Sequence, residues 1–344
     1  MKRLIYNSIA AALCLLLTVP AMAAKTEAQR PEHLAYAVDN NTTFELVNRY
    51  GDVNIENIKS DSLIIDVEIK VRAKNTDECI KKLAKISIVP TVAGGQIKVQ
   101  TEVDGPVDDY TVNYTVKMPA YLNLNLFNKY GNVVADKLLG KSNLKVNYGT
   151  LKLNKLHDQT GGFPTIELSY SSSSTIEEIE LGGINMSYSD VNVGSGKSVA
   201  VAGKYSNITV GDALSLAIEA AYGNVKIEKV AKLDLNARYT NVEVPEVSDY
   251  AQIVLSYGDL RSIGLAPGCR GVDVETKYAN TKIDASRLKK GDYQLDLNTQ
   301  YGSINAPHSK LVIKGTSSYN DTGDSNAHTK IKVTSKYGDI KIED

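Results

Sequence analysis

The segment LDLNARYTNVEV, from Leu233 to Val244, is one copy of a motif that recurs every 17 to 23 residues between residues 130 and 337. Each copy has two alternating apolar positions, a tyrosine, one spacer, Asp or Asn, and further alternating apolar positions. An earlier copy surrounds Tyr50. The repeated tyrosines are Tyr130, Tyr148, Tyr170, Tyr188, Tyr205, Tyr222, Tyr239, Tyr257, Tyr278, Tyr301, Tyr319 and Tyr337. A unit this short cannot bury its own apolar face, so successive copies must stack on one another.

The alternation of apolar residues predicts short β-strands, because side chains in a strand point to opposite faces in turn. We therefore expect an all-β fold, an elongated parallel β-helix or solenoid that is right-handed by the usual crossover preference. From Tyr205 onward every second copy has Gly after the tyrosine, as at Gly223 and Gly258. One motif or two could thus form a full turn, and this alternative stays open.

The tyrosines are predicted to form a structural ladder at the edge of the core, each ring stacked on the rings above and below. The ladder comprises Tyr130, Tyr148, Tyr188, Tyr205, Tyr222, Tyr239, Tyr257, Tyr278, Tyr301 and Tyr337. The step from Tyr239 to the next inward residue, Val242, is odd and requires a corner. We expect the Gly and Asx residues to supply that corner, since both tolerate positive φ. The chain has 20 Tyr, 3 Phe and no Trp, which fits a repeated need for a flat ring with a polar tip.

Other segments define the organisation of the chain. Residues 1–24 resemble an export signal, with Lys2 and Arg3 before an apolar run and a small-x-small cleavage site at Ala21-Met22-Ala23. That run is shorter than the about 20 residues of a membrane span, so no membrane span is predicted. Residues 25–40 are expected to be a flexible lead. Residues 41–121 predict an irregular N-terminal β region with one short helix at 76–85, capping the solenoid formed by residues 122–344.

Charge and cysteine content narrow the classes of function. The 39 basic and 40 acidic residues leave a net charge of −1, which argues against nucleic acid as a partner. Cys79 and Cys269 are interpreted as small buried hydrophobes rather than a disulfide. The four histidines are isolated, and no glycine cluster precedes a helix. We predict no catalytic residues, no metal site and no cofactor.

Basic residues stand directly before several tyrosines and form the best candidate for a binding surface. The predicted binding residues are Lys129, Lys204, Arg238, Lys277 and Lys336. This column is either a solvated edge or a track for an anionic glycan or a partner protein of the envelope. Self-association is a further open alternative. An enzymatic alternative, a β-helix polysaccharide lyase or hydrolase, would use the carboxylates Asp259, Asp273 and Glu275 together with Arg261.

The Tyr-Gly-Asp/Asn-Val repeat, the export signal, the irregular N-terminal region and the triplet Gly183-Ile184-Asn185 resemble the bacterial "putative adhesin" families of the head-GIN type. The resemblance covers residues 40–344. It implies a β-helical, non-enzymatic protein of the cell envelope, exported to the periplasm, the cell surface or the medium. It supplies no catalytic residues.

Overall fold

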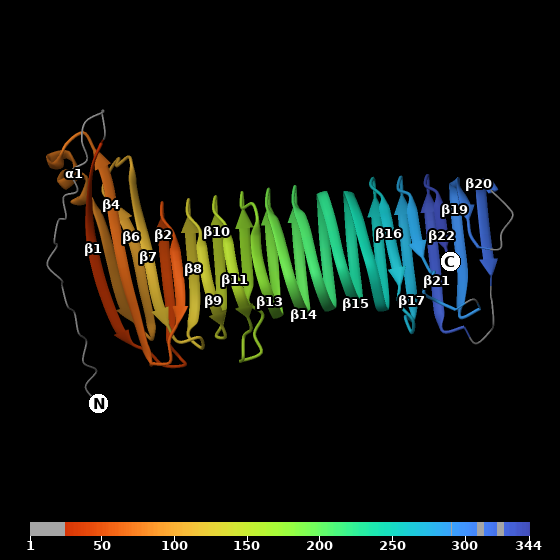
Figure 1. Cartoon of the computed structure of the whole chain (residues 1–344), viewed down its shortest axis with the longest axis horizontal. Coiled ribbons are helices and arrows are strands. Elements are labelled where there is room, and N and C mark those ends of the chain that lie inside the picture. Colours follow the sequence, from red (N-terminus) through yellow and green to blue (C-terminus); the bar gives the residue numbers. More distant parts are fainter. Residues whose placement is uncertain (1–24, 290, 308–312, 322–326) are drawn as a thin grey trace. The chain divides into compact units, whose positions relative to one another are not determined.

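The computed structural model describes residues 25–289, 291–307, 313–321 and 327–344 (Figure 1). The expected export signal lies outside these residues. The described chain is all-β with one short helix, as predicted. It forms two compact units, one ending at Ser171 and the other beginning at Ser172. No helix in the described part of the chain is long and apolar enough to cross a membrane.

The first unit contains two rows of paired strands. One row pairs in the order β1, β4, β7, β3, β9, β11 and the other in the order β5, β6, β2, β8, β10, β12. The bounds are β1 Thr26–Ala37, β2 Thr43–Arg49, β3 Val53–Asn57, β4 Ser62–Ala73, β5 Ile86–Ala93, β6 Gln96–Val103, β7 Tyr110–Met118, β8 Asn123–Lys129, β9 Val133–Leu138, β10 Ser142–Asn147, β11 Leu151–Leu156 and β12 Thr165–Ser169. Pairing is antiparallel for β1–β4, β4–β7 and β5–β6, and parallel elsewhere.

Residues 25–40 are not the flexible lead that we expected. Residues 26–37 form β1, which pairs antiparallel with β4 along its whole length, from Thr26 opposite Ala73 to Ala37 opposite Ser62. The sequence of β1 is mostly polar, and Ala28 is its one buried residue. Backbone hydrogen bonds to a strongly alternating neighbour, rather than an apolar pattern of its own, therefore make this segment a strand.

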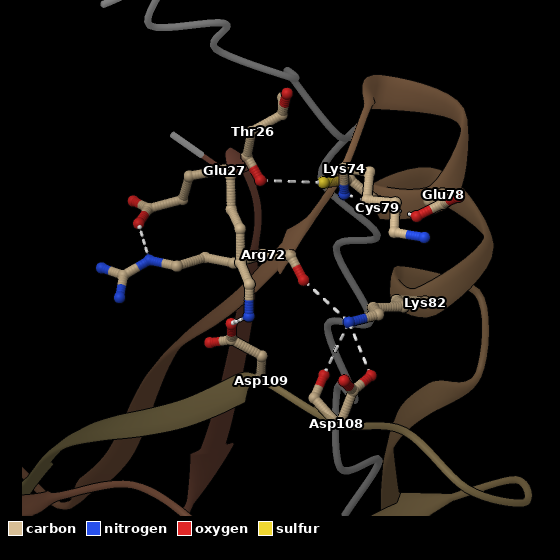
Figure 2. Close-up of polar contacts among 10 residues, drawn as sticks. Thr26, Glu27, Arg72, Lys74, Glu78, Cys79, Lys82, Asp108 and Asp109 are labelled. Atoms are coloured by element: carbon tan, nitrogen blue, oxygen red, sulfur yellow. Dashed lines mark hydrogen bonds and ion pairs between the residues drawn. The ribbon is translucent and has the colours of Figure 1, made fainter. Parts of the chain in front are cut away.

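The helix α1 spans Thr76–Leu83, two residues shorter at its C-terminal end than predicted. Asn75 caps its N-terminus, because Asn75 Oδ1 accepts a hydrogen bond from the Glu78 N–H at 2.9 Å. Lys82 near its other end donates to the carbonyl oxygens of Arg72 and Asp108 at 2.7 and 2.9 Å (Figure 2). Asn75 thus closes the first turn of the helix, and Lys82 ties its last turn to the strand region.

The second unit is built from longer strands, because the strand after one tyrosine often continues into the strand before the next. The bounds are β13 Ser174–Ser187, β14 Asp190–Lys204, β15 Asn207–Ser256, β16 Leu260–Leu265, β17 Gly271–Lys277, β18 Thr281–Asp284, β19 Tyr293–Asn305, β20 Ile313–Asp321, β21 Thr329–Lys336 and β22 Ile340–Glu343. Between β14 and β15 the register advances by one motif, so Asp190 lies opposite Asn207. Pairing is parallel throughout except for β19–β20.

The last strands of the second unit do not follow chain order. β21 pairs in parallel with β17 on one side and with β19 on the other (Figure 1). β22 pairs in parallel with both β18 and β19. The final motif is therefore inserted between two motifs that precede it in the sequence. β20, the strand of the Tyr319 copy, pairs antiparallel with β19 and leaves the parallel pattern.

The core consists of the inward-pointing members of each alternating strand. In the motif around Tyr239, Leu233, Leu235, Val242 and Val244 are at most 3% exposed. The charged residues between them, such as Glu243, face outward. This alternation is the pattern from which the strands were predicted, and burial of these side chains is the main force holding the copies together.

Candidate functional site

Within each unit the tyrosine rings stack into a ladder. Neighbouring ring centroids are 4.7 to 4.9 Å apart. In the first unit the order is Tyr50, Tyr130, Tyr148, Tyr170, and in the second it is Tyr188, Tyr205, Tyr222, Tyr239, Tyr257, Tyr278, Tyr337, Tyr301. Tyr222 contacts Tyr239 at 4.8 Å, which shows that one motif, not two, separates neighbouring rings.

The corner of each motif is the tyrosine itself. Every ladder tyrosine has a positive φ between 50° and 61°, whereas the Asx residue two positions later does not. Our expectation that Gly and Asx supply the positive φ was therefore wrong. A non-glycine residue in this region costs about 1–3 kcal/mol, so the stacked rings must offset a strain repeated at each copy.

The left-handed corner also turns the ring outward. Tyr239 is 47% exposed, although counting along an extended chain places its side chain with the buried Leu233 and Leu235. Ring planes in the second unit are within 16° of parallel, so each face is covered by the next ring. A ligand would therefore meet ring edges and hydroxyl groups rather than aromatic faces.

The Asp and Asn residues that follow the tyrosines form a parallel hydrogen-bonded column. Asn207 Oδ1 accepts hydrogen bonds from the backbone N–H and the side-chain amide of Asn224 at 3.1 and 2.9 Å. Asp190 makes the same pair of contacts to Asn207 at 3.2 and 2.7 Å. These side chains join one motif to the next. Their hydrogen-bonding groups therefore serve the structure of the stack rather than a ligand.

The predicted basic residues lie along the ladders. Lys129 in the first unit has its Nζ 4.8 Å from the centre of the Tyr130 ring. In the second unit, Lys204, Lys277 and Lys336 lie 5.4 to 5.7 Å from the rings of the tyrosines that follow them. Lys277 and Lys336 are directly paired neighbours on β17 and β21. These distances suit cation–π contacts.

Lys204 and Arg238 are brought together at a hollow of about 540 Å³ in the second unit. The residues that line it are Asn185, Met186, Ala202, Gly203, Lys204, Glu219, Ala220, Ala221, Asn236 and Arg238. The small residues before Tyr205 and Tyr222 leave the space, and Ala221 occupies the position between the two cations. We did not predict this hollow, although the runs Ala202-Gly203 and Ala220-Ala221 are the signal that could have revealed it.

The two cations of the hollow differ from most of their neighbours. Within the described chain, neither Lys204 nor Arg238 has a carboxylate oxygen within 4.0 Å. Nearby lysines do have such partners: Lys197 pairs with Glu180 at 3.3 Å and Lys226 with Glu228 at 2.6 Å. An anionic group could therefore approach Lys204 and Arg238 without displacing an existing ion pair.

Asp259 and Asp273 of the enzymatic alternative have separate structural contacts. Asp259 belongs to the Asx column, where its Oδ1 accepts from the Asn280 amide at 3.2 Å. Asp273 lies on β17 and pairs with Lys332 on β21 at 2.9 Å. Among the described residues, no group of three or more His, Cys, Asp or Glu side chains could hold a metal ion. Cys79 and Cys269 are free and buried, as predicted.

Parallel pairing of successive motifs, a ladder of stacked tyrosines and charged outward faces define an all-β repeat protein. The chain belongs to the Toastrack DUF4097 family, which it matches over residues 38–343. Among curated proteins, none is significantly similar in sequence.

Several solved structures are similar to this chain over 91% of its length. They include a putative cell adhesion protein from Clostridium sporogenes (11% identity, 99% of that chain, TM-score 0.20). Two others are a putative adhesin from Parabacteroides merdae (11% identity, 96% covered, TM-score 0.35) and a putative adhesin from Bacteroides fragilis (11% identity, 97% covered, TM-score 0.32).

Proposed function

We propose that this is a non-enzymatic, exported protein of the cell envelope that acts as an adhesin or interaction protein. Its binding surface is the basic edge beside the tyrosine ladder, with Lys129, Lys204, Arg238, Lys277 and Lys336 as binding residues. The observation that carries the proposal is that Lys204 and Arg238 line one hollow and that, among the described residues, neither forms an ion pair, although Glu219 also lines the hollow.

The chemistry of this edge fits an anionic partner. Lys204 and Arg238 stand two motifs apart, which is about 9.6 Å at the spacing of adjacent strands. The hydroxyl groups of Tyr205, Tyr222 and Tyr239 run alongside and can donate hydrogen bonds. A glycan that carries carboxylate or sulfate groups matches this arrangement, and so does an acidic surface of an envelope protein.

The proposed architecture is an elongated, right-handed β-solenoid formed by residues 122–344 and capped by residues 41–121. One motif per step and the parallel pairing within each unit support it. The repeat and the Gly183-Ile184-Asn185 triplet are the grounds for relating the chain to the head-GIN-type adhesins. Residues 1–24 would direct it to the periplasm or the cell surface.

Binding of the mature chain to immobilised polygalacturonate and dextran sulfate tests this function, with neutral dextran as the reference. We expect retention on the anionic polymers that falls as salt rises, because exposed charges are screened within about 10 Å at 0.1 M ionic strength. The double variant Lys204→Glu, Arg238→Glu should lose retention. The matched control Lys197→Glu, Lys226→Glu carries the same change in net charge and should retain it.

Two outcomes would contradict the proposal. Equal loss of retention in both double variants would show that net charge alone, and not the hollow, attracts the polymer. Release of unsaturated uronate or new reducing ends from polygalacturonate would favour the alternative, a β-helix polysaccharide lyase or hydrolase.

A further inference from the structure

A second hollow of about 530 Å³ lies in the second unit, where β17, β21 and β19 begin. Its lining residues are Tyr250, Arg270, Val272, Asp273, Gln294, Leu295, Asp296, Lys330, Ile331 and Lys332. None of the residues predicted for the basic edge lines it. It therefore lies outside the binding surface proposed above.

The strand register explains why this hollow exists. Tyr250, Gly271, Lys330 and Gln294 lie side by side on four adjacent strands. Gly271 has no side chain, so a gap separates the Tyr250 side chain from that of Lys330, two strands away. Two strand spacings are about 9.6 Å, which is room for one flat ring between them.

Gly271 is fixed as glycine by its backbone. Its φ is +143°, and a Cβ atom there would lie 2.0 Å from the carbonyl oxygen of Lys330. The gap beside Tyr250 is thus a built feature of the strand register rather than an accident of a flexible side chain.

Tyr250 differs from the ladder tyrosines. Its ring contacts no other aromatic ring within the described chain, and the Arg270 guanidinium lies 5.8 Å from its centre. The ladder shows that rings on adjacent strands of this unit stack at 4.7 to 4.9 Å. No aromatic ring of the described residues stacks on Tyr250 over Gly271, and the Arg270 side chain, which pairs with Asp249, borders this place.

Hydrogen-bonding groups lie beside the gap, two residues further along the same three strands. There Asp273, Lys332 and Asp296 are side by side. Lys332 Nζ pairs with Asp273 Oδ2 at 2.9 Å, and the buried Asp273 Oδ1 accepts no hydrogen bond. Lys330 has no ion-pair partner in the part of the chain that the structure describes. The wall therefore offers carboxylate acceptors, the ammonium donor of Lys330, and the Tyr250 ring with the Arg270 guanidinium beside it.

We propose that this hollow binds a single sugar ring, stacked on Tyr250 above Gly271, with its hydroxyl groups bonded to Asp273, Asp296 and Lys330. Carboxylates accept hydrogen bonds from hydroxyl groups, and Lys donates to ring or hydroxyl oxygens. A peptide strand is disfavoured, because the strands at this hollow are already paired on both sides and leave no free edge for an added strand.

Ligand-observed NMR with methyl β-glucoside and methyl β-glucuronide tests the site in the full mature chain. We expect saturation transfer to the C–H protons of the ring in the wild type. Tyr250→Phe should bind within twofold of the wild type, and Tyr250→Ala at least tenfold more weakly. Tyr250→Leu keeps the apolar volume without the flat face and should bind as weakly as the alanine variant while retaining the wild-type melting temperature.

Further variants and ligands distinguish this site from the basic edge and distinguish sugars from other ligands. Lys204→Glu, Arg238→Glu should bind both glycosides like the wild type, whatever happens to its retention on polyanions. Lys330→Gln should weaken the glucuronide more than the glucoside if the ligand is acidic, and both equally if it is neutral. The proposal is overturned if neither glycoside binds, if Tyr250→Leu binds like the wild type, or if adenosine binds through Tyr250 and the sugars do not.

Discussion

Tyr337 stacks directly on Tyr278, with ring centroids 4.7 Å apart and planes 2° from parallel. Tyr301, whose motif comes between them in the chain, contacts the opposite face of Tyr337 at 4.9 Å. Asp339 repeats the relationship, since its backbone N–H donates to Asn280 Oδ1 at 3.1 Å. The last motif has therefore taken the place that the Tyr301 motif would occupy in a sequential stack.

A chain that ends after Ala327 should lose order in β19. Its parallel neighbours β21 and β22 would be missing, and β20 alone would remain as a partner. Hydrogen exchange followed by mass spectrometry should show residues 293–305 exchanging as fast as an unfolded peptide, while residues 207–256 keep their protection. Retained protection in β19 would mean that it docks directly on β17 in the vacated place.

Tyr239→Ala should lower the free energy of unfolding by about 1–3 kcal/mol, because two stacked aromatic contacts are lost at about 0.5–1.5 kcal/mol each. This range lies below that for a fully buried aromatic, since the ring is 47% exposed. Tyr239→Phe keeps both stacks and should unfold at nearly the wild-type urea concentration. An alanine variant with an unchanged midpoint would show that the ladder adds no stability and serves another purpose.

Gly223→Ala should destabilise the second unit. A Cβ atom at Gly223 would lie 1.9 Å from the carbonyl oxygen of Ser206, a backbone atom that cannot rotate away. Overpacking of this kind costs about 1–3 kcal/mol, and we expect the upper end. Ser215→Ala, at an exposed position of the same strand β15, is the control and should leave the urea midpoint unchanged. Equal urea midpoints for Gly223→Ala and Ser215→Ala would show that neighbouring motifs can move apart enough to accommodate the added Cβ atom at little cost in stability.

Acid should weaken the ion pairs around Glu246. Hydrogen bonds from Arg287 and Lys229 hold the pKa of the Glu246 carboxyl below its usual value of 4.5. Because the folded-state pKa is lowered, this stabilisation is complete above pH 4.5 and disappears as the pH falls through the folded-state value. Melting temperatures between pH 6 and pH 3 should fall less steeply for Glu246→Gln than for the wild type. Parallel pH profiles would exclude this carboxyl from the acid response.

Much of this protein's fold could be predicted from its sequence, because the tyrosine motif repeats and each copy contacts mainly its neighbouring copies. The alternation in segments such as Leu233–Val244 determines which side chains are buried, and burial dictates strands and stacking. The tyrosine ladder and the short helix within residues 76–85 were predicted for the same reason: each depends on neighbours a few residues away or one repeat away.

Tertiary structure decided the features that depend on contacts between distant segments. β1 is a strand because β4 lies beside it, and its own polar sequence gives no such signal. The positive φ of Tyr239 arises where two strands meet at a corner, so its exposure could not be counted from an extended chain. The insertion of β21 between β17 and β19 sets Lys330 beside Gly271 and Tyr250, because strand pairing fixes neighbours in space without regard to their order in the chain.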